Sequence, residues 1–441
     1  MASKPQQPAP ALSGQAEPPF APAFPEIGVI ALVPDTWHWL WQPRHQVMTR
    51  LARYFHVAWM NPAEDWRESL SPRRLFSRTK ASEVPLPAEG FIVNTPSPWL
   101  PLCYRPATLA RFLFRRRLRR ARQILLDRGC KKIVLYLWRP EFSPALDLLP
   151  ADLACYHIDD EYSFSAVDTP VSDQEQRLIA RSGQVFIHSP ALLEKKGSIN
   201  PNTAFAPNGV DFSLYARPGS EPADLASIPR PRIGYTGHIK RQLDWPLLVA
   251  LALRHPEWNF VFVGPTNPHP EIKSFLDQLS AMPNVRFLGG KSVMQLAEYP
   301  KHFDVCLMPY VLDNYTKYIY PLKLHEYLAS GRPVVGSSIE SLKKFKDVVL
   351  LPQGVDEWSQ SIAAALTPAL STPAASSARQ AVARRHDWNT IVRRIAGLIA
   401  LRLGHPSAAS LAGESDELPP REATTSISES LQHVLEGKRA N

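Results

Sequence analysis

The chain has 441 residues, of which 44% are hydrophobic and 21% charged. This globular composition excludes wholesale disorder and suits two domains better than one. No run reaches the roughly 18–20 apolar residues of a membrane-spanning helix, and residues 1–24 lack the apolar stretch of a secretory signal. We therefore expect a cytoplasmic protein. Its four cysteines are too widely spaced for a Cys-x-x-Cys pair and are predicted to be reduced core thiols: Cys103, Cys130, Cys155 and Cys306.

Charge is unevenly distributed along the chain. The formal net charge is +9, from 50 Lys and Arg against 41 Asp and Glu. Residues 1–25 sum to zero and residues 414–441 hold six acids and three bases, so the part between carries +12. A basic body suits phosphate-bearing partners, whether nucleotides, anionic lipids or nucleic acid, and composition does not choose among them.

The first half has the pattern of a parallel α/β domain. Residues 1–24, rich in Ala and Pro, are predicted to be a disordered arm. Beyond them, apolar runs without alternation are separated by helical patterns, which indicates a buried parallel sheet and a domain over 25–206. The predicted strands are 27–33, 56–62, 131–138, 153–159 and 184–189, and the predicted helices are 45–55 and 172–182.

The same alternation begins again in the second half, which predicts a second α/β domain over 207–377. Strands are expected at 231–237, 259–265, 284–290, 303–310, 332–338 and 346–352, with helices at 247–254, 271–281 and 324–330. An Ala/Ser/Pro linker at 367–377 precedes a last helix over 378–403, and residues 404–441 are predicted to be a disordered tail. The fold class is α/β, with two doubly wound parallel-sheet domains that bind ligands at the carboxyl ends of their strands.

Five motifs in the second half follow one another in a specific order: PNGVD (207–211), IGYTGHIKRQLDWPLL (233–248), FVFVGP (260–265), NVRFLGG (284–290) and the segment 303–335 with PLKLHEYLASGRPVV. They resemble the donor-binding half of GT-B glycosyltransferases of the retaining family 4, or group 1, type. Residues 34–52 and 156–165 resemble bacterial polysaccharide-assembly members. The resemblance implies a GT-B fold, two facing Rossmann-like domains with helix 378–403 packing back on the first.

The resemblance also implies a function. We expect a glycosyltransferase that moves a hexosyl group from a nucleotide-sugar, bound on residues 231–360, to a saccharide or lipid-linked acceptor, bound on residues 26–206, in bacterial surface polysaccharide synthesis. The reaction is expected to retain anomeric configuration and to need no metal or other cofactor. A sugar-nucleotide epimerase of the same fold and an inactive scaffold are the alternatives.

A diphosphate needs backbone N–H groups and cations, and the loop after strand 231–237 offers both. Gly237 ends that strand, and the resemblance assigns Lys240 or Arg241 to the diphosphate; a solvated charge pair is the alternative. The family usually has Arg directly after this glycine, where this chain has His238. Gly264 is expected to shape the pocket for the base, or only to form a turn.

Helix 324–330 carries the residue that the resemblance assigns to the donor ribose, Glu326. Many family members have a second glutamate eight positions earlier that contacts the transferred sugar, and this chain has Tyr318 there. Lys323 is expected to supply a compensating phosphate contact, or to be a solvated helix-start lysine.

Polar residues after strand 153–159 are the candidates for catalysis. His157, Asp159, Asp160 and Glu161 lie where the family places a catalytic or sugar-orienting group. Carboxylates there could stabilise an oxocarbenium-like transition state or orient the acceptor hydroxyl. A metal site at Asp159 and Glu161, or a simple capped loop, remains open.

Two further segments point to partners. The loop with Trp37, His38, Trp39, Trp41 and Arg44 is a candidate acceptor site, because aromatic faces stack on sugars, although the tryptophans could equally pack in the core. Eight arginines stand among leucines and phenylalanines between Arg105 and Arg122, a pattern typical of a basic amphipathic helix on an anionic membrane. A solvated basic face is the alternative, and nucleic acid is not expected because no recognition motif is present.

Overall fold

The computed structural model describes residues 21–38, 41–69, 89–163, 165, 167–266 and 269–413. They form two compact units. Unit 1 takes in residues up to 163, 169–207 and 389–413, and unit 2 takes in residues 165, 167–168 and 208–388. Residues 1–20 of the predicted arm, the predicted tail from residue 414 onward, and Trp39 lie outside the described residues.

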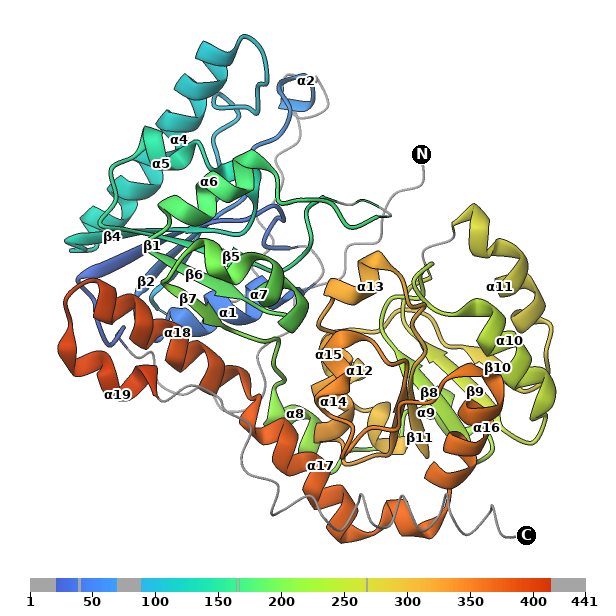
Figure 1. Cartoon of the computed structure of the whole chain (residues 1–441). Helices are drawn as coiled ribbons and strands as arrows, with labels where there is room; N and C mark the ends of the chain where they lie inside the picture. The colour runs from blue at the N-terminus through green and yellow to red at the C-terminus, as the bar shows by residue number, and fades with distance from the viewer. Residues whose placement is uncertain are drawn as a thin grey trace. The chain divides into compact units, whose positions relative to one another are not determined.

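Unit 1 is built on a seven-stranded, wholly parallel sheet with the strand order β3-β2-β1-β4-β5-β6-β7 (Figure 1). The order reverses between β1 and β4, which is where ligands bind in open sheets. All five predicted strands are present, and β3 and β7 are additional short edge strands. The bounds are β1 (Ile27–Leu32), β2 (His56–Met60), β3 (Phe91–Asn94), β4 (Lys132–Leu137), β5 (Leu153–Ile158), β6 (Gln184–Ile187) and β7 (Thr203–Phe205).

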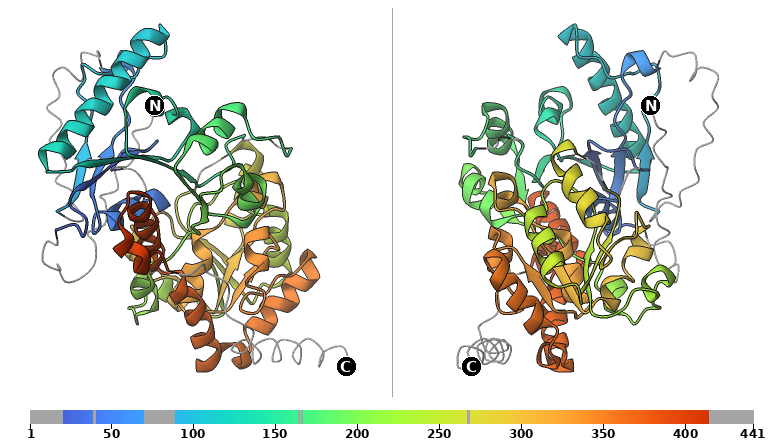
Figure 2. Two further views of the ribbon diagram at one scale, coloured as in Figure 1. Left: turned by 60° about the vertical axis from the view of Figure 1, so that its left-hand side comes forward. Right: turned by 90° about the vertical axis from the view of Figure 1, so that its right-hand side faces the viewer.

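Helices cover both faces of this sheet, with α4 and α5 on one face and α1 and α18 on the other (Figures 1 and 2). Helix α4 buries a stripe of Leu113, Leu118, Ala121 and Leu125 at helical spacing and leaves its opposite side exposed. The helices are α1 (Pro43–Leu51), α2 (Trp66–Ser69), α4 (Ala107–Asp127), α5 (Ala145–Leu148), α6 (Asp173–Arg181), α7 (Pro190–Lys196), α18 (Trp388–Arg402) and α19 (Ala409–Ala412).

Unit 2 has a five-stranded parallel sheet with the order β10-β9-β8-β11-β12, so its strand order reverses between β8 and β11. The strands are β8 (Arg232–Thr236), β9 (Asn259–Val263), β10 (Val285–Phe287), β11 (Val305–Met308) and β12 (Val334–Gly336). The helices are α8 (Phe212–Ala216), α9 (Ala223–Ala226), α10 (Trp245–Arg254), α11 (Lys273–Ser280), α12 (Val293–Leu296), α13 (Asn314–Tyr318), α14 (Leu322–Ala329), α15 (Glu340–Lys343), α16 (Gly354–Ala365) and α17 (Pro373–Arg385). The predicted class of two doubly wound parallel-sheet domains is confirmed.

Three predicted segments differ from the structure. Residues 346–352 form no regular strand and contribute one bridge, Val335 to Leu350. The helix expected over 378–403 is two helices, α17 and α18, separated by His386 and Asp387, and α17 already begins inside the expected linker. Composition indicated the helical character of 378–403 correctly, but it did not indicate the start of α17 within 367–377 or the lack of a regular strand at 346–352.

Both ends of the described chain are ordered where disorder was predicted. The N–H of Phe24 donates to the carbonyl of Tyr54 at 2.8 Å, and the Phe24 ring lies 5.4 Å from that of His405. A Cβ on Gly397 of α18 would lie 2.4 Å from the backbone nitrogen of Ala412, so α19 packs tightly on α18. These contacts hold residues 21–24 and 404–412 in unit 1. The amino-acid composition of the two segments does not predict these contacts.

All four cysteines are free thiols, three of them buried. Across the described ranges, no helix combines the length and the apolar character that crossing a bilayer requires.

Candidate active site

The glycines at the ends of β8 and β9 bring two loops of unit 2 into direct contact. The N–H of Gly237 donates to the carbonyl of Val263 at 2.8 Å, and Gly237 has a φ of +108°. A Cβ on Gly264 would lie 2.1 Å from the Gly237 oxygen. Only glycine allows this approach. Gly237, at the end of β8, is partly exposed, whereas Gly264 is buried.

Lys323 of α14 reaches the same place. A Cβ on Gly237 would lie 2.5 Å from its Cε and 2.6 Å from its Nζ. The ammonium lies 5.0 Å from the centroid of the Tyr235 ring and hydrogen-bonds the Tyr310 hydroxyl. The positive charge is therefore held against the glycine backbone that ends β8.

The loop after Gly237 adds further positive charge. The Nζ of Lys240 lies 5.6 Å from the centroid of the Tyr315 ring, and Arg241 is exposed. Burial lowers the pKa of His238 at this spot, and the charges of Lys323 and Lys240 lower it further. This spot is suited to bind an anion.

Glu326 lies one turn along α14 from Lys323 and is half-buried. The Tyr215 hydroxyl of α8 hydrogen-bonds its carboxylate. Burial raises the pKa of Glu326, while Lys323 and the Tyr215 hydrogen bond oppose that rise. The backbone N–H of Thr236, at the end of β8, donates to the Tyr327 hydroxyl at 2.7 Å and ties α14 to the strand.

Tyr318, where the family pattern has a glutamate, is buried and paired with a carboxylate. Its hydroxyl donates to Asp168 at 2.6 Å, and the Lys317 ammonium lies 3.0 Å from the same oxygen. A carboxylate therefore lies beside Tyr318, and it comes from Asp168, 150 positions earlier in the chain.

In unit 1, Arg44 links the loops that follow β1 and β5. Its guanidinium donates to Asp159 at 2.7 Å and also pairs with Asp35. The Tyr162 hydroxyl donates to the other Asp159 oxygen at 2.6 Å. Arg44 and Asp159, predicted to bind acceptor and to act in catalysis, are thus engaged with each other.

Two other predicted residues are in the core. His157 is 4% exposed; its ring stacks on Trp138 at 4.1 Å and its Nδ1 lies 2.8 Å from the Tyr136 hydroxyl. Burial lowers the pKa of His157 to about 3, so the imidazole is neutral. Trp37 is buried in an aromatic cluster with Trp59, and His38 is exposed. These placements favour packing roles for His157 and Trp37.

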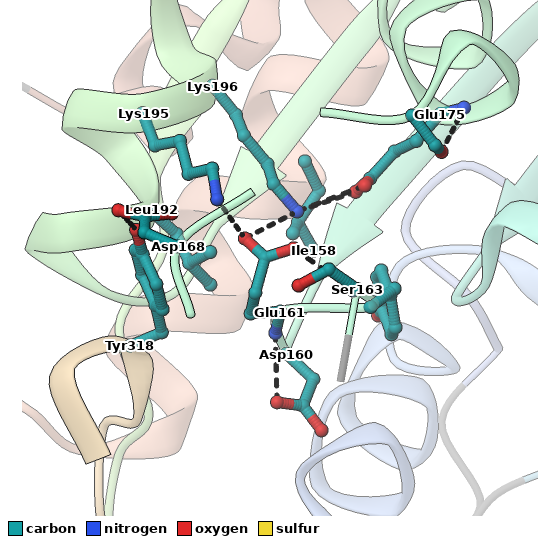
Figure 3. Close-up of polar contacts among 12 residues, drawn as sticks. Ile158, Asp160, Glu161, Ser163, Asp168, Glu175, Leu192, Lys195, Lys196 and Tyr318 are labelled. Carbon is teal, nitrogen blue, oxygen red and sulfur yellow. Dashed lines mark hydrogen bonds and ion pairs between the residues drawn. The ribbon is translucent and has the colours of Figure 1, made fainter. Parts of the chain in front are cut away.

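Asp160 differs from its neighbours. It is half-buried, and its Oδ1 accepts the Glu161 N–H at 2.8 Å. Figure 3 shows the Asp160 carboxylate on the opposite side of the turn from the ammonium groups of Lys195 and Lys196, which contact Glu161 at 3.3 Å each. Of the three predicted catalytic residues, His157 is buried in the core, Asp159 pairs with Arg44, and Asp160 accepts the Glu161 N–H.

The carboxylates weighed as metal ligands already have cationic partners. Arg44 neutralises Asp159, and two lysines neutralise Glu161. Within the described ranges, no group of three or more His, Cys, Asp or Glu side chains has the arrangement of a metal site. Asp159 and Glu161 are therefore engaged with cationic side chains of the protein itself.

The sequence model of one family, glycosyl transferases group 1, matches residues 230–368. Residues 230–368 are therefore similar to group 1 glycosyl transferases. TuaH of Bacillus subtilis (strain 168), whose name assigns it to teichuronic acid biosynthesis as a glycosyltransferase, is 28% identical over 236 residues. That match covers 51% of this chain and 58% of TuaH, so the chain spans little more than half the length of this relative.

Solved structures support the fold of most of the chain. An E. coli structure described as trehalose-6-phosphate bound with UDP-2-fluoro glucose has a TM-score of 0.59 at 12% identity and covers 86% of this chain and 99% of its own. A glycosyltransferase of Rickettsia africae has a TM-score of 0.57 at 11% identity, with the same coverage. The fold is GT-B.

The segment that the family model matches, residues 230–368, contains every residue predicted to bind the donor. Gly237, Gly264 and Lys323 come together at the strand ends, with Lys240 beside them and Glu326 one turn away on α14. Tyr318 is engaged with Asp168, and Arg241 is exposed.

Sequence reasoning missed the residues that hold these groups in place. They are Tyr215 at Glu326, Tyr310 at Lys323, Asp168 at Tyr318, and Lys195, Lys196 and Glu175 near Glu161. Each lies far along the chain from its partner or on another element. The sequence offered one signal for such residues, namely an acid or a lysine at a helical position that would otherwise be apolar, as at Lys196.

Proposed function

We propose that this protein is a glycosyltransferase that uses a nucleotide-sugar donor and a saccharide or lipid-linked acceptor in bacterial surface polysaccharide synthesis. The observation that carries the proposal is the convergence of Lys323 on the Gly237 backbone within the segment that the group 1 family model matches. Exposed backbone and a fixed ammonium suit a diphosphate, and the nearby Glu326 carboxylate suits ribose hydroxyls. The name of TuaH is consistent with a polysaccharide product.

In the proposed reaction, the bond between the anomeric carbon and the β-phosphate oxygen breaks, and a bond from that carbon to the acceptor oxygen forms. The acceptor proton passes to a donor phosphate oxygen, so the products are the glycoside and a nucleoside diphosphate. Retention of configuration is part of the proposal. Lys323 and Lys240, rather than a metal ion, neutralise the leaving diphosphate.

The acceptor side of the proposal rests on unit 1. Asp160 follows β5 at the carboxyl end of the sheet, where open α/β sheets bind ligands. Its carboxylate orients the acceptor hydroxyl or stabilises positive charge at the anomeric carbon. Arg44 and Asp159 position the surrounding loops, and His38 remains a candidate contact with the acceptor.

Thermal unfolding with a panel of UDP-, GDP- and dTDP-sugars tests the donor site, because a ligand that binds only the folded state raises its midpoint. One class of nucleotide should stabilise the wild type, and Glu326→Ala should abolish the shift. Glu340→Ala is the matched control, since Glu340 is an exposed acid of unit 2 paired with Lys343. The absence of a shift with every nucleotide would contradict the proposal.

Product analysis separates the enzyme classes. Incubation of the stabilising nucleotide-sugar with p-nitrophenyl glycosides should yield a longer glycoside and free nucleoside diphosphate. An isomerised nucleotide-sugar formed without acceptor would instead identify an epimerase, and binding without any product would identify a scaffold.

We also propose that α4 attaches unit 1 to an anionic membrane surface. Its exposed side carries Arg115, Arg116, Arg119 and Arg120, and its only acid is the last residue, Asp127. Large apolar side chains are exposed at and before its first turns: Trp99 at 79%, Tyr104, Leu109 and Phe112. The N-terminal half of α4 projects past the sheet (Figures 1 and 2). Aromatic and basic residues on one surface suit the lipid interface.

Sedimentation with phosphatidylglycerol-containing vesicles tests the attachment. Binding should be weakened by salt and by Trp99→Ser with Phe112→Ser, whereas Leu253→Ser, at an exposed leucine of unit 2, should leave it unchanged. Binding that is equal for all variants, or none at all, would contradict the membrane proposal.

A further inference from the structure

The turn after β5 is anchored on both sides of Asp160. On one side, Asp159 accepts hydrogen bonds from Arg44 and Tyr162 at 2.7 and 2.6 Å. On the other side, the Glu161 carboxylate lies between the ammonium groups of Lys195 and Lys196 (Figure 3). Asp160 is the residue between these two anchors, and its own Oδ1 accepts the N–H of Glu161. Its direction therefore depends on where Glu161 is held.

The anchor at Glu161 is buried and charged. Lys196 is 0% exposed and lies 2.9 Å from Glu175 and 3.3 Å from Glu161. Lys195 lies 3.3 Å from the same Glu161 oxygen. The Tyr156 hydroxyl donates to Glu175 at 3.0 Å. Two ammonium groups thus meet two carboxylates in a cluster that we call the lysine–glutamate network (Glu161, Glu175, Lys195 and Lys196).

The support behind this network is rigid. Both lysines end α7, whose first turn is capped by the Ser189 hydroxyl at 3.3 Å from the Leu192 N–H. Glu175 lies in the first turn of α6, where the Ser172 hydroxyl caps the helix. Three of the four charges, Lys195, Lys196 and Glu175, are therefore placed by capped helices, whereas Glu161 lies in the turn after β5.

The Glu161 oxygen that faces the lysines makes ion contacts but no hydrogen bond. Its attraction to the network therefore depends on its charge and not on the geometry of a donor. Buried ion pairs add little to stability compared with apolar packing, and their best-supported use is to select one arrangement. A neutral amide at this position would keep the size of the side chain and lose the attraction.

From these contacts we propose that Glu161 is a positioning residue for Asp160, acting through the lysine–glutamate network. The proposal rests on the proposed function, in which Asp160 meets the acceptor. It goes beyond that function by assigning the buried charges of α6 and α7 to the orientation of one carboxylate.

A double-mutant cycle between Glu161→Gln and Asp160→Asn tests the proposal, with the nucleotide-sugar that stabilises the wild type and a p-nitrophenyl glycoside as acceptor. Glu161→Gln should lower kcat/KM for the acceptor by about 10- to 100-fold, because small misplacements of reacting groups have effects of this size. The Kd of the nucleoside diphosphate, bound on unit 2, should change less than about twofold. In the Asp160→Asn background, Glu161→Gln should change kcat/KM less than about threefold.

Asp147→Asn is the matched control, since Asp147 is an exposed acid of unit 1 that pairs with Arg181 at 2.6 Å. If Glu161→Gln fails to fold, the test uses Lys195→Met instead, because Lys195 lies at the rim of the network and its replacement leaves Lys196 in place. Lys195→Met should lower kcat/KM, and Lys195→Arg, which keeps the positive charge, should restore it.

A wild-type rate for Glu161→Gln, or effects that multiply independently of Asp160, would overturn the positioning role while the enzyme remains active. If the wild type transfers no sugar at all, the proposed function and this inference fail together, so the two failures are distinguishable.

Discussion

Replacing Gly237 by alanine should damage the donor site in two separable ways. At a φ of +108°, a side chain strains the backbone by about 1–3 kcal/mol. For a unit of this size that lowers Tm by roughly 2–12 °C. The new Cβ would also lie 2.6 Å from the Lys323 Nζ, so the ammonium must move. Losing a charged contact to a phosphate costs about 1.5–3 kcal/mol, or roughly 10- to 150-fold in Kd.

Gly354→Ala separates these effects. Gly354 also lies in unit 2 and has a φ of +69°, but an added Cβ would meet no atom within 4 Å. Calorimetric titration with UDP, GDP and dTDP should show weakened binding for Gly237→Ala and wild-type binding for Gly354→Ala, while melting shows both destabilised. Equal loss of affinity in both variants, or wild-type affinity in Gly237→Ala, would refute the assignment of Lys323 to the diphosphate.

Three further predictions concern stability. Lys196→Met removes the central cation of the lysine–glutamate network and should destabilise unit 1 by about 3–5 kcal/mol in urea unfolding, and Lys196→Met with Glu175→Gln should recover part of that loss. Burial raises the folded-state pKa of Glu326, so its ionisation lowers stability as pH rises through that pKa; Glu326→Gln should therefore raise Tm at pH 8 and change it little at pH 4. Burial lowers the pKa of His45 and His157 to about 3, below the usual 6.5. The unfolded chain therefore takes up protons first as the pH falls, and unit 1 should lose stability between pH 6.5 and pH 4. In urea unfolding across this pH range, His45→Asn should reduce the number of protons taken up on unfolding by one.

Sequence periodicity was sufficient for the strands of both sheets that lie fully in the core. Continuous apolar runs such as those of β1 and β4 can only be buried on both faces. Sequence periodicity failed at elements whose ends depend on hydrogen bonds to other segments of the chain. Residues 346–352 have the composition of a strand, yet only Leu350 finds a place beside β12, because the sheet ends there.

The donor residues were predictable because their motifs are local in sequence, from Gly237 to Glu326. The catalytic candidates were less so. Asp159 and Asp160 are neighbours of the same type, and nothing in the sequence distinguishes the one paired with Arg44 from the one that accepts the Glu161 N–H. That distinction depends on α1 and α7, whose charged residues meet the turn only after the sheet has formed.

The return of α18 to unit 1 has a consequence for how the protein is made. Unit 2 is continuous from residue 208 to 388, so a ribosome synthesises this stretch before α18 and α19 of unit 1. Until residues 389–402 emerge, the sheet of unit 1 lacks the cover that Val392, Ile395 and Ile399 provide. The nascent chain therefore completes its second domain before its first, and a stop codon near residue 389 would leave the earlier domain uncovered and prone to aggregate.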